Sequence, residues 1–210
     1  MRADRELSRG DAGLVALSAA IAGGDPGSVA AGAEEALHHG VSPSALYETL
    51  LQSYLFVGFP RAIEALFAAG PVLKRHGWAP PSAGRADPEG WVRAGEALCR
   101  RVYGRNYAKL VDTMRGLSPD LASWMILEGY GKTLSRPGLS ATTREYCVVA
   151  ILTTTRMWRQ LRSHAIGAVN VGGTRAGVRE SIVLCGPVAG EAAVREALRV
   201  TGGEAADARG

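Results

Sequence analysis

The stretch of the chain that decides its fold covers residues 136–190 and reads RPGLSATTREYCVVAILTTTRMWRQLRSHAIGAVNVGGTRAGVRESIVLCGPVAG. Residues 146–152 form a continuous apolar run that fits one buried helix. Gly172 and Gly173 are placed to end the next helix, and Thr174 is placed to cap the one after it. Because no alternating strand pattern competes over a useful length, this stretch predicts a series of packed helices.

The whole chain is a divergent tandem repeat, in which the C-terminal half aligns without a gap on the N-terminal half at an offset of 132 positions, as from Leu7 to Leu139. The matching positions are Leu7-Ser8 with Leu139-Ser140, Ala36 with Ala168, Gly40 with Gly172, Glu48 with Glu180, Gly58 with Gly190 and residues 64–66 with 196–198. In the first half, Gly40 ends one helix, and Ser42 with Pro43 begins another. The predicted fold class is therefore all-α, with two tandem helical repeats.

The predicted organisation is an N-terminal repeat over residues 1–76, a linker over 77–90 and a C-terminal repeat over 91–210. The linker is inferred from its content of Pro, Gly and Ala. Two further helices, over residues 91–115 and 120–134, are expected to precede the second core, the later one opened by Ser118-Pro119.

Composition excludes several classes of protein. A hydrophobic share of 47% in 210 residues is ample for a packed core, and the net charge of +4 comes from scattered arginines rather than from a stripe that would bind nucleic acid. We find no apolar run of roughly 18–20 residues that would span a membrane and no secretory signal, so we expect a cytoplasmic protein. Cys99, Cys147 and Cys185 form no close-spaced pair, and we expect no metal site and no disulfide framework.

Residues 136–190 resemble the carboxymuconolactone decarboxylase family, which also contains the alkylhydroperoxidase D-like proteins. Redox members of that family open their histidine-bearing helix with a Cys-x-x-Cys pair, and this chain has Met157 and Gln160 at those two positions. His164 matches the family's histidine, and Glu145 matches the glutamate that helps to relay protons. Because a thioether and an amide cannot cycle through a disulfide, the resemblance argues against direct peroxidase chemistry.

Decarboxylase members of the family lack the thiol pair as well, and commonly carry a glutamate where this chain has Gln160. The resemblance therefore implies a cofactor-independent lyase, or a related proton-transfer enzyme, that acts on a small carboxylated lactone or a similar anion. In this hypothesis His164 delivers a proton to carbon, a task suited to an imidazole because its ordinary pKa of about 6.5 is close to working pH. Glu145 would orient His164, and Gln160 would position His164 or the substrate.

Several arginines near this pair are candidates to bind the carboxylate of the substrate, since a guanidinium matches a carboxylate in shape and charge. Arg156 and Arg159 precede His164 in the sequence, and Arg144 adjoins Glu145. We add Trp158 to the predicted substrate-binding set, although packing is the more frequent role of such a tryptophan. The arginines could equally form a solvated or subunit-facing surface.

Other interpretations stay open from the sequence. Glu145 fits a capping box with Thr142, in which it would only reach back to its own helix start. The offset of 132 places Gly13 opposite Glu145 and Gly32 opposite His164, so the first repeat is expected to be structural.

The alternatives in function are a non-catalytic oligomeric protein that binds a small molecule or acts as a scaffold, and, less favoured, a thiol-dependent peroxidase that uses Cys147 or Cys185. Family members assemble through helical faces, and a two-repeat chain resembles a fused dimer. The resemblance therefore implies a homo-oligomer, namely a trimer that mimics a hexamer.

Overall fold

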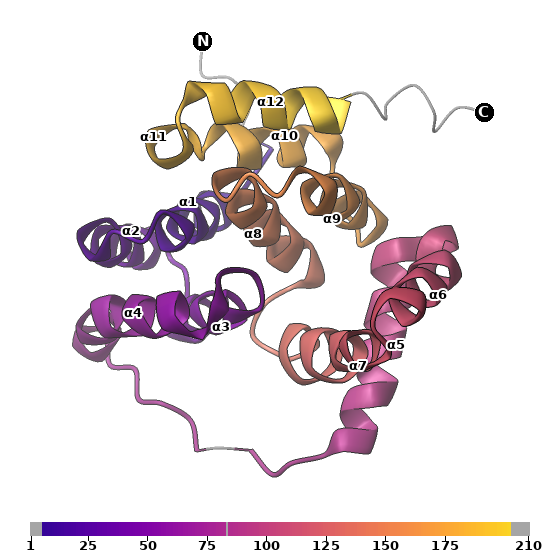
Figure 1. Cartoon of the computed structure of the whole chain (residues 1–210). Coiled ribbons are helices and arrows are strands. Elements are labelled where there is room, and N and C mark those ends of the chain that lie inside the picture. Colours follow the sequence, from indigo (N-terminus) through magenta and orange to yellow (C-terminus); the bar gives the residue numbers. More distant parts are fainter. Residues whose placement is uncertain (1–5, 83, 203–210) are drawn as a thin grey trace.

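The structure of the chain, a computed structural model, describes residues 6–82 and 84–202 (Figure 1). Every regular element in those ranges is a helix, which confirms the predicted fold class. The first repeat comprises α1 (Arg9–Gly23), α2 (Pro26–His38), α3 (Pro43–Gln52) and α4 (Tyr54–Arg75). The second repeat comprises α8 (Ala141–Thr154), α9 (Trp158–Asn170), α10 (Arg175–Val183), α11 (Gly186–Ala189) and α12 (Glu191–Gly202). Between them lie α5 (Pro88–Tyr103), the 3-10 turn η1 (Gly104–Asn106), α6 (Tyr107–Leu117), α7 (Pro119–Trp124) and the π-helix η2 (Met125–Leu134).

The first helices of the two repeats, α1 and α8, begin with the same cap. Ser8 accepts a hydrogen bond from the N–H of Asp11 at the start of α1, and Ser140 accepts one from the N–H of Thr143 at the start of α8. Each of these serines satisfies a backbone donor that the first turn of a helix leaves unpaired. The two caps are 132 positions apart, as the alignment of the repeats predicts.

Glycines at equivalent turns also adopt the same backbone conformation. The φ angle is 84° at Gly40 and 106° at Gly172, where α2 and α9 have just ended. Gly58 bends α4 with φ 78° and ψ 164°, and Gly190 separates α11 from α12 with φ 82° and ψ 156°. Residues that carry a Cβ atom rarely adopt such backbone angles, so the shape of the repeat requires glycine at these four positions. The tandem repeat is thereby confirmed.

The two repeats interlock through their first helices, α1 and α8, which pack against each other near the middle of the molecule (Figure 1). The hydroxyl of Thr143 donates a hydrogen bond of 2.7 Å to the carboxylate of Asp11, its equivalent in the other repeat. Val15 and Ala19 of α1 belong to the apolar core of the second repeat, and Cys147 of α8 belongs to that of the first. The chain is thus built as a fused dimer with shared cores.

The insertion between the repeats is held together by close contact between the backbones of α5 and η2. A Cβ atom on Gly131 would lie 2.0 Å from the carbonyl oxygen of Trp91, and one on Gly95 would lie 2.1 Å from that of Ile126. Only glycine permits such an approach. The insertion has a small core of its own, and α5 also packs against α9 of the second repeat.

The helix predicted over residues 91–115 is interrupted in the structure. It begins earlier, at Pro88, where the side chain of Asp87 accepts a hydrogen bond from the N–H of Gly90. It stops at Gly104, whose φ of 51° ends α5 before η1 and α6 continue the chain. The prediction missed this break because a glycine inside an amphipathic pattern does not by itself show that the helix ends.

The helix predicted over residues 120–134 begins as expected but changes its geometry. Ser118 caps α7 and Pro119 occupies its first position, as the sequence indicates. From Met125 the helix widens into η2, a change that periodicity alone does not reveal. Stretches of π-helix are rare in proteins, and those that occur often lie near functional sites.

Helix α4 meets a less strict criterion for a membrane span than an uninterrupted apolar run, since Arg61 and Glu64 interrupt its apolar residues. By length and composition it passes that test, with a mean hydropathy of 1.3 in a window of which 22% is buried. This is weak evidence for a membrane span, since core helices of soluble proteins meet the same criterion. Much of the apolar character is a stripe of exposed side chains, Phe59 (64% exposed), Ile63 (46%) and Phe67 (74%), which recur every four residues along one side of α4.

Candidate active site

Helices α8 and α9 bring Glu145 and His164 into direct contact. The Nδ1 atom of His164 lies 2.8 Å from the Oε2 atom of Glu145, within the second repeat. Both side chains are almost completely buried, with 4% and 5% of their surfaces exposed. A short contact of this kind fixes the orientation of the imidazole and leaves Nε2 as the nitrogen that can meet a substrate.

Glu145 does not act as the helix cap that the capping-box pattern allowed. The N-cap of α8 is Ser140 rather than Thr142, and its hydroxyl group satisfies the N–H of Thr143. Thr142 instead donates its hydroxyl hydrogen bond to the carbonyl of Val171, after the end of α9. The carboxylate of Glu145 is therefore directed to His164 and not to its own helix start.

Gly167, one turn after His164 on α9, makes room for this pair. A Cβ atom at Gly167 would lie 3.0 Å from the Oε2 atom of Glu145 and 2.7 Å from a methyl group of Val102 on α5. Further along α9, the side-chain amide of Asn170 donates a hydrogen bond of 2.8 Å to the carbonyl of Val102. The end of α5 is thereby fixed over the pair.

Aromatic side chains that the sequence did not single out flank His164. The ring of Phe56 is edge-on to the imidazole at a centroid distance of 5.6 Å, and the ring of Tyr103 is tilted at 6.5 Å. Tyr103 in turn contacts Tyr130 of η2 at 6.1 Å. The helices that carry these rings are distant in sequence from α9, so no spacing could have shown them.

Burial dominates the ionisation of the groups around the pair. It raises the pKa of Tyr103 to about 12, against the effect of a hydrogen bond from Tyr130, and the charge of Glu145 acts in the same direction as burial. Burial also raises the pKa of the Cys99 thiol to about 12, and that of Tyr130 well above its ordinary value. These phenols and this thiol are therefore neutral hydrogen-bonding groups near neutral pH.

Arg144 is not brought into the site. Its guanidinium is buried between the repeats, where it donates to the carboxylate of Glu48 at 2.9 Å and to the side-chain oxygen of Gln52 at 3.0 Å. Arg136 binds the same carboxylate. The position of Arg144 does not support its predicted contact with a substrate, because its charge is matched inside the protein and it faces α3 rather than His164.

The other predicted substrate-binding residues lie at the turn between α8 and α9 and at the start of α9. Arg156, Arg159 and Gln160 are exposed there, and Trp158 is half-buried against the core of the second repeat. Gln160 is one turn before His164 on the same helix. The structure therefore places these four on the surface beside the helix that carries His164, and does not bring them into the buried pair.

Arg156 has an unusual backbone conformation. Its φ of 59° is in the left-handed region. Among the residues that the structure describes, Arg156 is the one non-glycine residue with a positive φ. The equivalent position in the first repeat, 132 residues earlier, is Gly24, with φ 84°. A left-handed arginine costs about 1–2 kcal/mol, and strain of this kind is often kept where the side chain has a function.

The first repeat packs its helices closely at the positions that hold the pair in the second. A Cβ atom on Gly13 would lie 3.1 Å from the Cα of Ala36, and one on Gly32 would lie 3.5 Å from the Cα of Leu17. These glycines let α1 and α2 approach each other. The prediction that this half has a structural role agrees with that packing.

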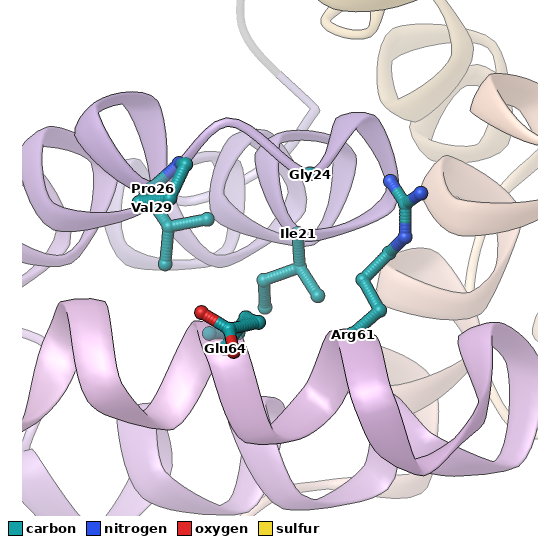
Figure 2. Close-up of a pocket in the computed structure, with 7 residues that line it drawn as sticks. Ile21, Gly24, Pro26, Val29, Arg61 and Glu64 are labelled. Carbon is teal, nitrogen blue, oxygen red and sulfur yellow. The ribbon is translucent and has the colours of Figure 1, made fainter.

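The first repeat also has a shallow pocket, lined by Ile21, Gly24, Pro26, Val29, Arg61, Glu64 and Ala65. Figure 2 shows Arg61 extending from α4 toward the turn at Gly24. The guanidinium of Arg61 donates a hydrogen bond of 2.6 Å to the carbonyl of Ala22 and so closes that turn. We assign this pocket no part in chemistry, since Arg61 is bound to the turn and none of the lining residues belongs to the Glu145–His164 pair.

The architecture and this pair define the class of protein: an all-α chain of two fused repeats, with one buried histidine–glutamate pair in the second. A sequence model of the carboxymuconolactone decarboxylase family matches residues 1–70 and 119–202, and the chain therefore belongs to that family. The chain is also 31% identical, over 172 residues, to peroxisomal protein 2 of Schizosaccharomyces pombe. That alignment covers 77% of this chain and 78% of the yeast protein. Helices α5 and α6 lie between the two segments that match the family.

Proposed function

We propose that this protein is a cofactor-independent decarboxylase, or a related proton-transfer enzyme, that acts on a small carboxylated lactone or a similar anion. The observation that carries the proposal is the contact of 2.8 Å between His164 and Glu145 in a buried setting. A carboxylate on Nδ1 stabilises the imidazolium form, which can then give the proton on Nε2 to a carbon atom. Membership of the family is consistent with this reaction but does not specify it.

The proposed reaction needs no redox step. The bond between the substrate carbon and its carboxylate breaks, CO2 leaves, and the electron pair passes through the conjugated system to the lactone carbonyl oxygen. The resulting enolate returns the pair to the carbon next to the lactone carbonyl as His164 delivers a proton there, and the double bond now ends at the carbon that lost CO2. Glu145 holds the imidazole in position throughout and compensates its positive charge.

The substrate carboxylate is proposed to bind Arg156, with Arg159 and Gln160 nearby at the start of α9. Support comes from the left-handed backbone of Arg156, which is kept where the other repeat has a glycine. An exposed arginine at a tight turn can reach a carboxylate with two parallel hydrogen bonds. Trp158, packed on the core, would fix the turn rather than touch the substrate.

The direct test is the ultraviolet-monitored loss of 4-carboxymuconolactone with purified protein, run in heavy water. The proposal predicts loss of substrate and a product that carries one deuterium at the carbon next to the lactone carbonyl, where the enolate is protonated. Loss of substrate without deuterium at that carbon would contradict proton delivery as the final step. If the substrate is stable, the named substrate is rejected for this chain.

A second candidate function is a non-catalytic small-molecule-binding or scaffold protein. The low exposure of the pair favours it, because a substrate must displace neighbouring side chains to reach Nε2. Calorimetric titration with small carboxylates and lactones distinguishes the two functions. Saturable binding with no turnover across the panel would favour the binding protein, and turnover of any member would exclude it.

Thiol-dependent peroxidase activity is the least supported alternative. Cys147 and Cys185 are completely buried, and burial raises the pKa of each thiol to about 12. A peroxide is attacked by a thiolate that it can reach, and neither thiol meets either condition. Full activity of a variant that lacks both cysteines would remove this alternative.

We further propose that the chain forms a homo-oligomer, a trimer of two-repeat chains that mimics a hexamer. The exposed apolar stripe on α4 supports an assembly surface. The equivalent positions on α12 are Glu191, Arg195 and Arg199, which form surface ion pairs along that helix. The two repeats therefore differ at this face, and only the first offers it to an apolar partner.

The cytoplasmic location stays a prediction. The yeast relative is named as a peroxisomal protein, so its name gives no support to a cytoplasmic site. Imaging of the tagged protein in its own cells would test the prediction.

A further inference from the structure

The segment between the two family-matched parts of the chain, residues 71–118, places the hydroxyl group of Tyr103 near the proposed site. Tyr103 is the last residue of α5, and its ring lies 6.5 Å from that of His164. The side-chain amide of Asn170 and the missing Cβ of Gly167 hold this end of α5 against α9. Tyr103 is therefore set at a fixed place beside the pair rather than on a loose loop.

The hydrogen bonding of Tyr103 leaves its proton available. Tyr130, buried behind it on η2, donates a hydrogen bond to the Tyr103 oxygen, which favours the ionised form of Tyr103 and lowers its pKa. Burial has the larger effect and raises the pKa of Tyr103 to about 12. Tyr103 therefore stays protonated near neutral pH, accepts from Tyr130 and can donate to a third group.

The surroundings indicate where that third group would lie. The rings of Phe56 and Tyr103 flank the imidazole, so a flat ligand that reaches Nε2 of His164 would contact apolar ring surfaces. Tyr103 is only partly buried, whereas His164, Glu145 and Tyr130 are buried. The phenol is thus the more accessible polar group of this cluster.

We propose that Tyr103 is a substrate-binding residue whose hydroxyl donates a hydrogen bond to the oxygen atom that gains negative charge during the reaction. This inference rests on the proposed function and narrows its substrate class to carboxylates borne on a saturated carbon next to a conjugated carbonyl system, whose electrons flow to the carbonyl oxygen as CO2 leaves. In that step the carbon–carboxylate bond breaks and its electron pair forms the enolate. Tyr103 keeps its proton, and His164 supplies the one that carbon receives. A preorganised donor of this kind acts mainly on the transition state.

Replacement of Tyr103 by phenylalanine keeps the ring and removes only the hydroxyl group. We expect Tyr103→Phe to lower kcat by about 100-fold and to change KM by less than about threefold, as the loss of one oxyanion donor does. Tyr130→Phe should have a smaller effect in the same direction. Tyr47, half-buried against Trp78 on the first repeat, provides a matched control, and Tyr47→Phe should leave both constants unchanged.

A binding measurement separates this inference from the proposed reaction. The probes are 4-hydroxy-3-nitrobenzoate, a planar carboxylate with an ionised phenol that mimics the enolate oxygen, and 3-nitrobenzoate, which lacks that oxygen. Tyr103→Phe is expected to weaken binding of the first probe by about tenfold and to leave the second unchanged, since only the first loses a hydrogen bond to a charged oxygen.

Each outcome decides one of the two proposals. Wild-type turnover that Tyr103→Phe does not reduce would overturn the role of Tyr103 and leave the reaction in place. Equal effects on both probes, or no binding of either, would also overturn it. Selective loss of the phenolate probe, in a protein that does not decarboxylate the lactone, would support the oxyanion site while the proposed reaction fails.

Discussion

Neighbouring residues on one helix can have unrelated roles, as Arg144 and Glu145 show. Successive side chains on a helix point about 100° apart, so two adjacent residues do not face the same partner. Glu145 faces α9 and His164, whereas Arg144 faces α3 and the buried carboxylate of Glu48. Adjacency in the sequence suggested a shared site, and helix geometry explains why that part of the prediction is not supported.

The pair itself could be predicted, because the resemblance relates Glu145 and His164 through a fixed spacing between consecutive helices. Phe56 and Tyr103 could not, since they reach His164 only through packing of α4 and α5 on the second repeat. The strained backbone at Arg156 was equally hidden. It becomes visible in the sequence only when the repeat alignment pairs Arg156 with Gly24 and the conformation of that glycine is known.

Arg156→Gly tests whether that strain has a function. The change should raise the free energy of unfolding by about 1 kcal/mol, because glycine adopts the left-handed conformation without strain. It should also raise KM for the anionic substrate, since the guanidinium is lost. Chemical denaturation and steady-state kinetics measure the two effects. Arg159→Gly, inside α9, is the control for stability alone and should instead lower the free energy of unfolding by about 1 kcal/mol. A stabilised Arg156→Gly with unchanged KM would remove Arg156 from the site.

The three cysteines give a second prediction about single residues. Because burial raises the pKa of Cys99, Cys147 and Cys185 to about 12, the thiols are neutral at any pH near neutrality and are inaccessible. We expect iodoacetamide to leave all three unmodified in the native protein and to alkylate all three after denaturation, as read by mass spectrometry. Rapid native labelling of Cys147 or Cys185 would contradict the burial and reopen the peroxidase alternative.

Single elements were predicted best where a cap or a glycine marks their ends. Ser42, Ser118 and Thr174 cap the helices that the sequence assigned to them. The break at Gly104 and the π-helix from Met125 were missed, because both depend on the contact of α5 with its neighbours rather than on local preference. Local signals thus determine where most helices start, and tertiary packing determines how the inserted ones are shaped.

The contact between α9 and α5 can be tested with one methyl group. Gly167→Ala places a Cβ atom 2.7 Å from Val102 and 3.0 Å from the Glu145 carboxylate. It should lower the free energy of unfolding by about 1–3 kcal/mol and reduce activity, because the pair is displaced. Gly116→Ala on α6 is the matched control. A Cβ atom there meets nothing within 4 Å, and this change should raise stability by about 0.5 kcal/mol.

Thermal and chemical unfolding, measured beside kcat, report both effects. An active Gly167→Ala with the stability of the wild type would show that α5 does not constrain the pair. It would also weaken the role proposed for Tyr103, since that residue depends on the same contact.

At the scale of the whole molecule, the two repeats have diverged into different tasks. The second keeps the acid–base pair, while the first replaces it with the close packing of α1 and α2 at Gly13 and Gly32. The first carries the apolar stripe on α4, while the second carries charges at the equivalent positions of α12. The repeat could be predicted from the constant offset, but this division of tasks on the surface required knowledge of which side chains are exposed.

Removal of the stripe should therefore break the proposed assembly. Light scattering after size exclusion should give the wild type a mass of a trimer of the 22.0 kDa chain, and Ile63→Glu with Phe67→Glu should reduce it to the monomer. Leu117→Glu, equally exposed at 75% but on α6, is the control and should not change the mass. A wild type that is a stable monomer would refute the oligomer, and an unchanged mass in the double variant would place its interface elsewhere.

The measurement that tests the central claim most directly is the rate of 4-carboxymuconolactone loss for the wild type, His164→Ala and His38→Ala in parallel. His38 is an exposed histidine on α2 in the first repeat, so its removal controls for loss of a histidine as such. The account predicts turnover by the wild type and by His38→Ala, and a fall of about 10²–10⁴-fold for His164→Ala. Equal turnover by all three proteins would contradict it, because His164 would then not be the proton donor.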